Sequence, residues 1–167
     1  MKDRFLRYYM DVAKRTAELS YATKLKVGAI LVKDDNIIGF SYNGTPSGWD
    51  NVAENRIYVS MEDAINLDYP ELYKKYPYSE NIKGENIRFD LKTKPEVSHA
   101  EENLILKLSK SNESSEGGIM FITHNPCYVC SRMIYGAGIS EVYYAEEYRD
   151  SSGIDFLLKC AIKVKKI

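Results

Sequence analysis

The sequence predicts a three-layer α/β domain, and three observations support this fold class. The chain opens with apolar residues at helical spacing. Two strand-like runs separated by a turn follow, and helices then alternate with strands up to the C-terminus. The 167 residues are enough for one domain that buries its own core. We therefore interpret residues 1–167 as a single domain, with residues 49–96 inserted after the first hairpin.

The first part of the chain predicts a helix and a β-hairpin. Apolar residues recur at helical spacing through residues 4–20, which predicts an amphipathic helix. Residues 26–32 and 37–42 are apolar and rich in β-branched side chains, and the Asp-Asp-Asn cluster at 34–36 is typical of a turn between two strands. Residues 43–48 have the composition of a loop.

The inserted segment shows no clear periodicity. Residues 61–67 and 69–76 predict two short helices, and the rest of the segment predicts no regular element. Five of the fourteen tyrosines lie in it, so we expect it to pack over the domain, as a subunit contact. The alternative is a surface excursion whose tyrosines are simply amphipathic.

The C-terminal half predicts helices and strands in alternation, joined by short connections that contain glycine. A helix near Cys127 should end at Gly136 or Gly138, because glycine favours the end of a helix. The predicted elements are helix 99–110, strand 119–123, helix 127–135, strand 141–145, helix 154–161 and strand 162–167.

Composition excludes several classes of protein. A net charge of −1 gives no basic excess, so no nucleic-acid partner is expected. No apolar run approaches the roughly 20 residues that cross a membrane, and residues 1–7 are charged and lack the apolar core of a signal peptide. Three cysteines, two of them in a C-x-x-C motif, favour a metal site in a reducing compartment such as the cytoplasm.

Two short motifs predict a catalytic zinc site. Cys127 and Cys130 lie three residues apart at the start of a predicted helix, so both sulfurs face one side. The helix N-terminus favours their thiolate forms. His99 supplies a third ligand, and a Cys₂His set leaves a fourth tetrahedral position for water, which is typical of catalytic zinc.

Glu101, two residues after His99, is placed to transfer protons. The combined H-x-E and P-C-x-x-C pattern is the signature of zinc-dependent nucleobase deaminases. The alternative is a structural zinc knuckle, or a C-x-x-C motif in an ordinary core. A structural four-cysteine site would need more cysteines than the chain has, and Cys160 is expected to be a small core residue.

The chain resembles the deoxycytidylate (dCMP) deaminases, including those of phages, within the cytidine deaminase superfamily. The zinc motifs by themselves indicate only the superfamily. The Tyr-Asn-Gly-x-Pro-x-Gly stretch at 42–48, the long insertion and Tyr148 indicate the dCMP branch. The similar segments are 26–32, 41–48, 97–103, 120–127, 138–144 and Tyr148. This resemblance implies a three-layer α/β/α fold with a mixed central sheet.

The resemblance also implies a reaction and a set of site residues. It implies hydrolysis of dCMP to dUMP and ammonia, which supplies dUMP for dTTP synthesis. It implies one catalytic Zn²⁺ on His99, Cys127 and Cys130, with Glu101 as the proton shuttle. Asn43 matches a residue that contacts the deoxyribose, and Tyr148 matches one implicated in nucleotide binding.

Regulation is a further implication of the resemblance. The family is activated by dCTP and inhibited by dTTP, with Mg²⁺ on the triphosphate, and is commonly a homohexamer. The effector site lies near the Tyr-Asn-Gly loop, so Lys26, Asn43 and Gly44 are the regulatory candidates.

Several alternatives remain open at this point. Asn43 could serve only the turn, and His124, where related enzymes often carry leucine, could contact substrate or pack beside the metal site. The activity could be that of a bifunctional dCMP/dCTP deaminase or of another zinc nucleobase deaminase. A non-enzymatic nucleotide sensor would have no reason to retain Glu101. Because the spare ligands are only His124 and Cys160, a second zinc ion is not expected.

Overall fold

A computed structural model describes residues 1–148 and 150–167. Its main body contains a five-stranded sheet in the order β2-β1-β6-β7-β8. Strand β1 pairs antiparallel with both β2 and β6, whereas β6, β7 and β8 run parallel, so the sheet is mixed as the resemblance implied. The strands are β1 (Gly28–Lys33), β2 (Asn36–Tyr42), β6 (Ile119–His124), β7 (Glu141–Glu146) and β8 (Lys163–Lys166).

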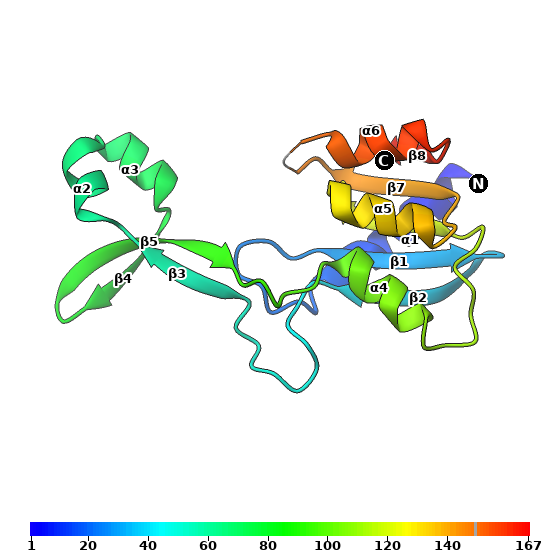
Figure 1. The fold of residues 1–167 in the computed structure, drawn as a ribbon, viewed down its shortest axis with the longest axis horizontal. Coiled ribbons are helices and arrows are strands. Elements are labelled where there is room, and N and C mark those ends of the chain that lie inside the picture. The colour runs from blue at the N-terminus through cyan, green and yellow to red at the C-terminus, as the bar shows by residue number, and fades with distance from the viewer. Residues whose placement is uncertain (149) are drawn as a thin grey trace.

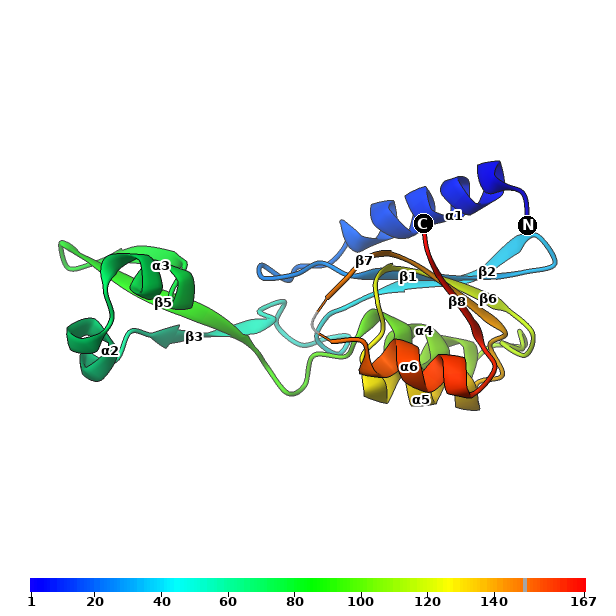
Figure 2. The same ribbon diagram turned by 90° about the horizontal axis from the view of Figure 1, so that it is seen from above.

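Helices cover both faces of this sheet. Helix α1 lies on one face, and α4, α5 and α6 lie on the other (Figure 2). The predicted three-layer α/β/α fold is therefore confirmed. The helices are α1 (Asp3–Ala17), α4 (Ala100–Leu108), α5 (Tyr128–Gly136) and α6 (Ser152–Lys159). Of the helices in the described part of the chain, none is both long and apolar enough to cross a membrane.

Strand β1 has apolar side chains on both faces of the sheet, so both faces must be covered by helices. Ile30 and Val32 pack toward α1 with Tyr9, whereas Ala29 and Leu31 pack toward the three-helix face. All four of these side chains are buried, which is typical of a strand enclosed between two layers. The side-chain alternation of the strand thus divides the interior into two apolar cores.

Helix α1 ends at Ala17, three residues earlier than the sequence pattern predicts. The chain turns there, because the Ser20 amide donates to the carbonyl of Ala17 and the Ser20 hydroxyl donates to the carbonyl of Asn43. This hydroxyl bond ties the end of α1 to the loop after β2. The other predicted elements of the main body are found within a few residues of their expected bounds.

The insertion forms a small α/β unit of its own. Its three-stranded antiparallel sheet has the order β3-β5-β4, formed by β3 (Glu54–Tyr58), β4 (Tyr78–Ile82) and β5 (Glu85–Thr93). The predicted short helices are confirmed as α2 (Met61–Asn66) and α3 (Tyr69–Lys75). The three strands were not predicted. Strands β3 and β4 have five residues each and show no clear alternation, and the alternation of apolar Ile87, Phe89 and Leu91 with charged residues in β5 was overlooked.

The expectation that the insertion packs over the domain is wrong. The small unit extends to one side of the main body, and its base lies near the N-terminal end of α4 (Figure 1). Its aromatic side chains mainly contact one another: Phe89 packs against Tyr58 and Tyr78. The insertion is therefore an outlying unit that contacts the main body through its base.

Candidate metal centre and its cavity

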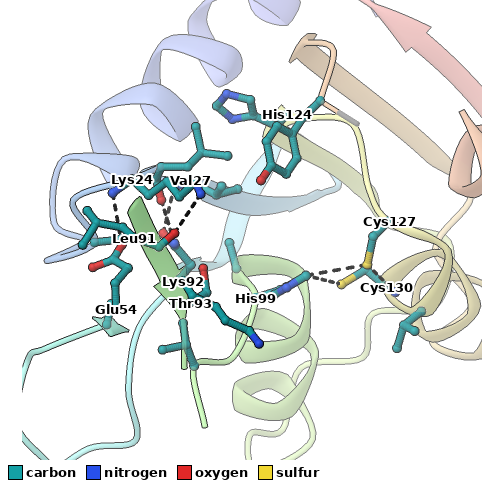
Figure 3. A pocket seen from close by; sticks show the side chains of 18 of the residues that line it. Lys24, Val27, Glu54, Leu91, Lys92, Thr93, His99, His124, Cys127 and Cys130 are labelled. Atoms are coloured by element: carbon teal, nitrogen blue, oxygen red, sulfur yellow. Dashed lines mark hydrogen bonds between the residues drawn. The ribbon is translucent and has the colours of Figure 1, made fainter. Parts of the chain in front are cut away.

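The three predicted metal ligands lie at the starts of two helices. Cys127 is the N-cap residue of α5, and its sulfur accepts a hydrogen bond from the backbone amide of Cys130 at 3.5 Å. His99 is the N-cap residue of α4, and its backbone amide donates to the Glu102 carboxylate at 3.3 Å. The two helices run side by side in the same direction, so their starts lie next to each other (Figure 1), and His99, Cys127 and Cys130 converge there (Figure 3). Both helix dipoles therefore favour negative charge between them.

The spacing of the three donor atoms fits a tetrahedral zinc ion. Nδ1 of His99 lies 3.6 Å from Sγ of Cys127 and 3.3 Å from Sγ of Cys130. A tetrahedral ion with ordinary Zn–S and Zn–N bond lengths would hold such atoms about 3.6 Å apart. Within residues 1–148 and 150–167, this is the one group of three such side chains close enough to share an ion.

The electrostatics of the cluster favour a thiolate. Hydrogen bonds from the Cys130 thiol and from His99 lower the pKa of Cys127 to about 3. The hydrogen bond to Cys127, together with burial, raises the pKa of Cys130. The two sulfurs thus share one proton, which metal binding must release. The donor set fits zinc, whose ligands here would be one imidazole and two thiolates.

Glu101 lies in the first turn of α4, and its side chain is buried at 4% exposure. Burial raises the pKa of its carboxyl to about 7, although the neighbouring His99 partly opposes this shift. A carboxyl with a pKa near neutrality can both accept and release a proton at physiological pH. The predicted proton shuttle therefore has the required environment and lies beside the metal ligands.

A cavity of about 1170 Å³ opens over this centre. All three metal ligands and Glu101 contribute to its walls, and so do all three predicted substrate residues, Asn43, His124 and Tyr148. Lys26 and Gly44, two of the predicted effector residues, are not among the lining residues. Lys26 is exposed, and Gly44 forms a two-way backbone bridge with Ser98, just before α4.

Asn43 uses its side chain to fix the loop before β1. Its Oδ1 accepts from the amide of Val27 at 2.8 Å, and its Nδ2 donates to the carbonyl of Leu25 at 2.9 Å. The side chain thus has a structural role, but one that joins two loops and not the local Asn-Gly turn role that the sequence left open. The amide still has one N–H and one lone pair that these bonds do not use, so the sugar contact stays a prediction.

His124 and Tyr148 form a second wall of the cavity. Their rings meet edge to face, with centroids 6.1 Å apart. Nδ1 of His124 lies 3.0 Å from Oγ1 of Thr123, and burial lowers the pKa of His124, so its ring is neutral near pH 7. The side chain of Asn125 accepts from the Tyr148 amide, which holds this tyrosine at the cavity.

Sequence reasoning missed the contribution of the insertion to the cavity. The residues Glu54, Lys75, Asp90 and Lys92 all line it, although no contact of the inserted segment with the site was predicted. Residues of this outlying unit reach the cavity because its base lies near the N-terminal end of α4 (Figure 1), where His99 and Glu101 also lie. The sequence offers one weak indication. Arg88, Asp90 and Lys92 occupy every second position of β5, which places three charged side chains on one face of this strand.

The sequence matches a family model described as the cytidine and deoxycytidylate deaminase zinc-binding region, over residues 3–146. Two curated relatives are similar at modest identity. ComE operon protein 2 of Bacillus subtilis (strain 168) is 29% identical over 86% of this chain and 60% of its own length. The deoxycytidylate deaminase of Homo sapiens is 31% identical over 86% of this chain and 66% of its own length. The chain thus spans about two thirds or less of these two relatives.

A solved structure matches over the full length. The dCMP deaminase of cyanophage S-TIM5, crystallised in complex with dCMP and dUMP, is 35% identical. The alignment covers 100% of this chain and 99% of the phage chain, with a TM-score of 0.74. The matched region therefore includes the insertion as well as the main body.

Proposed function

The chain belongs to the cytidine and deoxycytidylate deaminase family, and from this premise we propose that it hydrolyses dCMP to dUMP and ammonia. The family gives the type of reaction, which is hydrolytic deamination. The choice of substrate is supported by the full-length similarity to a phage enzyme that was crystallised with dCMP and dUMP. The reaction consumes one water: the ring C–NH₂ bond breaks, and a C–O bond forms on the same carbon.

Each residue of the centre has a distinct task in this reaction. His99, Cys127 and Cys130 would hold the zinc ion. When bound, zinc supplies Lewis-acid chemistry that makes hydroxide available near neutral pH. The Glu101 carboxylate takes one proton from the attacking water and delivers it to the ring nitrogen. It then takes the second proton from the hydroxyl group formed on the same carbon and delivers it to the departing amino group, which leaves as ammonia. Burial keeps this carboxyl close to the pKa that such two-way transfer requires.

The observation that carries the proposal is the position of Glu101. A structural zinc site needs ligands but no buried carboxyl beside them, whereas deamination needs a group that moves two protons. Glu101 is 4% exposed, shares α4 with a metal ligand and lines the cavity. A non-catalytic nucleotide sensor would not require this arrangement.

The proposal also covers the allosteric regulation, the oligomeric state and the cellular compartment of the enzyme. We propose activation by dCTP and inhibition by dTTP, each carrying Mg²⁺, at a site that includes Lys26, Asn43 and Gly44, in a homohexamer. The resemblance in the Tyr-Asn-Gly loop supports this regulation. The thiolate ligands favour a reducing compartment, so we propose that the enzyme works in the cytoplasm, or in the host cytoplasm if a phage encodes it.

Ammonia release by the zinc-loaded protein tests the proposal directly. The substrates to compare are dCMP, dCTP, deoxycytidine and cytosine, each with and without added dCTP–Mg²⁺ or dTTP–Mg²⁺. We expect dCMP to be preferred, with dCTP raising the rate and dTTP lowering it. Turnover of dCTP itself would indicate the bifunctional alternative. Absence of dCMP turnover in the presence of zinc and dCTP would overturn the proposal.

A further inference from the structure

Two parts of the chain build the cavity over the metal centre. The main body supplies the metal ligands and Glu101, whereas the insertion supplies residues of β3, α3 and β5. A nucleoside monophosphate carries its reacting amino group and its phosphate at opposite ends. With the base at the metal ligands, the phosphate must lie against another part of the wall.

A set of polar contacts fixes the insertion beside the metal centre. The Glu54 carboxylate accepts from the backbone amides of Thr23 and Lys24, at 3.0 and 3.1 Å. The Lys24 ammonium in turn donates to the Asp90 carboxylate at 3.1 Å and to the carbonyl of Leu91 at 2.7 Å. These bonds hold β3 and β5 against the loop before β1 (Figure 3), so the last residues of β5 have a defined place at the cavity.

The lysines that line the cavity differ in their partners. Lys24 is paired with Asp90, and Lys75 is paired with Asp63 at 2.8 Å. Lys92, near the end of β5, also lines the cavity, and no carboxylate of the described residues lies within ion-pair distance of its ammonium. Its side chain leaves β5 on the same face as that of Asp90, two residues earlier.

Apart from the lysines, the described residues of the cavity wall carry no positive charge that would attract an anion. No arginine is among the described lining residues. His124 is neutral near pH 7, because burial lowers its pKa. The carboxylates of Glu101, Glu102 and Asp150 also line the cavity and would repel a phosphate. A phosphate dianion bound here therefore needs a cation that is not already paired.

We propose that Lys92 binds the 5′-phosphate of the nucleotide and so makes the enzyme prefer a nucleoside monophosphate to the corresponding nucleoside. The insertion is then part of the substrate site, and Lys92 determines specificity without taking part in the chemical step. An ammonium on a flexible stem can reach a phosphate as a point charge and needs no fixed geometry. This inference rests on the proposed nucleotide deamination.

The test compares Lys92→Gln with Lys83→Gln, which removes the same charge from the exposed turn between β4 and β5, at the opposite end of β5. For zinc-loaded protein, we expect Lys92→Gln to lower kcat/KM for dCMP by roughly 10- to 100-fold, mainly through KM. We expect kcat/KM for deoxycytidine to stay unchanged, Lys83→Gln to resemble the wild type, and Lys92→Arg to restore much of the dCMP preference.

Calorimetric binding of the product separates this inference from the proposed function. The wild type should bind dUMP more tightly than deoxyuridine, and Lys92→Gln should lose that difference, whether or not the protein turns over dCMP. An equal loss for dCMP and deoxycytidine would assign Lys92 a purely structural role and overturn the proposal. Unchanged dCMP kinetics and unchanged dUMP affinity in Lys92→Gln would also overturn it.

Discussion

At the scale of single residues, Glu101 is the group on which the proposed chemistry depends. It lies on the same helix turn as His99 and is almost completely buried. The substitution Glu101→Gln keeps the shape of the side chain and removes the proton transfer. We expect the variant to bind one zinc ion per chain and to lose about 10²- to 10⁴-fold in turnover of dCMP. Metal analysis and ammonia release measure the two effects, and a fully active variant would exclude the assigned role.

The burial of Glu101 also predicts a pH-dependent stability of the metal-free protein. Burial raises the pKa of this carboxyl from its ordinary value of 4.5 to about 7. The folded state therefore holds the proton more tightly than the unfolded chain. The stability that this carboxyl contributes is fully present below about pH 4.5 and is lost as the pH rises through 7, by roughly 3 kcal/mol.

Urea denaturation of the metal-free wild type and of Glu101→Gln, at pH 5 and pH 8, measures this loss. The wild type should lose about 2.5 kcal/mol more than the variant between the two pH values, because part of the full effect lies below pH 5. The comparison removes the contributions of other titrating groups, because both proteins contain them. Parallel pH dependences in the two proteins would contradict the prediction.

At the scale of elements, the close packing of α6 on the metal-binding loop supports the zinc site. A Cβ atom at Gly153, in the first turn of α6, would lie 2.1 Å from the carbonyl oxygen of Pro126 and 2.9 Å from the carbonyl carbon of Cys127. Only glycine permits this approach of the two backbones. The helix thus holds the segment that carries the first thiolate ligand.

Gly153→Ala should therefore displace the ligand loop and weaken zinc binding by roughly 10- to 100-fold, as loss of outer-shell support commonly does. Competition with a chromophoric chelator measures the affinity. Gly136→Ala is the matched control, because a Cβ at that position, the last residue of α5, would meet no heavy atom within 4 Å. Equal zinc affinities in the two variants would show that the packing of α6 does not support the site.

At the scale of the whole molecule, stability should be unevenly distributed. The main body has two large apolar cores, one on each face of its sheet. In the insertion, the large buried apolar side chains between residues 54 and 93 are Tyr76, Phe89 and Leu91. A small core offers little burial to offset the entropy of an ordered chain.

Hydrogen exchange with mass spectrometry should show this difference. We expect amides of β4 and β5 to open with a lower free energy than those of β1, β6 and β7, so that they exchange at least about tenfold faster at neutral pH. The metal-free and zinc-loaded forms should both show this order. Equal protection of the two units would mean that the insertion folds cooperatively with the main body.

By itself, the sequence determined the candidate metal centre and the main-body elements, because both depend on local spacing. Cys127 and Cys130 lie three residues apart at a helix start, so their sulfurs converge in any fold that forms this helix. The end of α5 was equally predictable, since Gly138 adopts the left-handed conformation (φ +70°) that favours glycine.

Only the tertiary structure decided where the insertion lies and what it contributes to the cavity. The contact between Lys24 and Asp90 joins residues 66 positions apart, and nothing in the pattern around either residue indicates its partner. Strands β3 and β4 of the insertion have no apolar alternation and are held by pairing with β5. Local periodicity reports which face of an element is buried, but the wall of a cavity depends on contacts between elements distant in sequence.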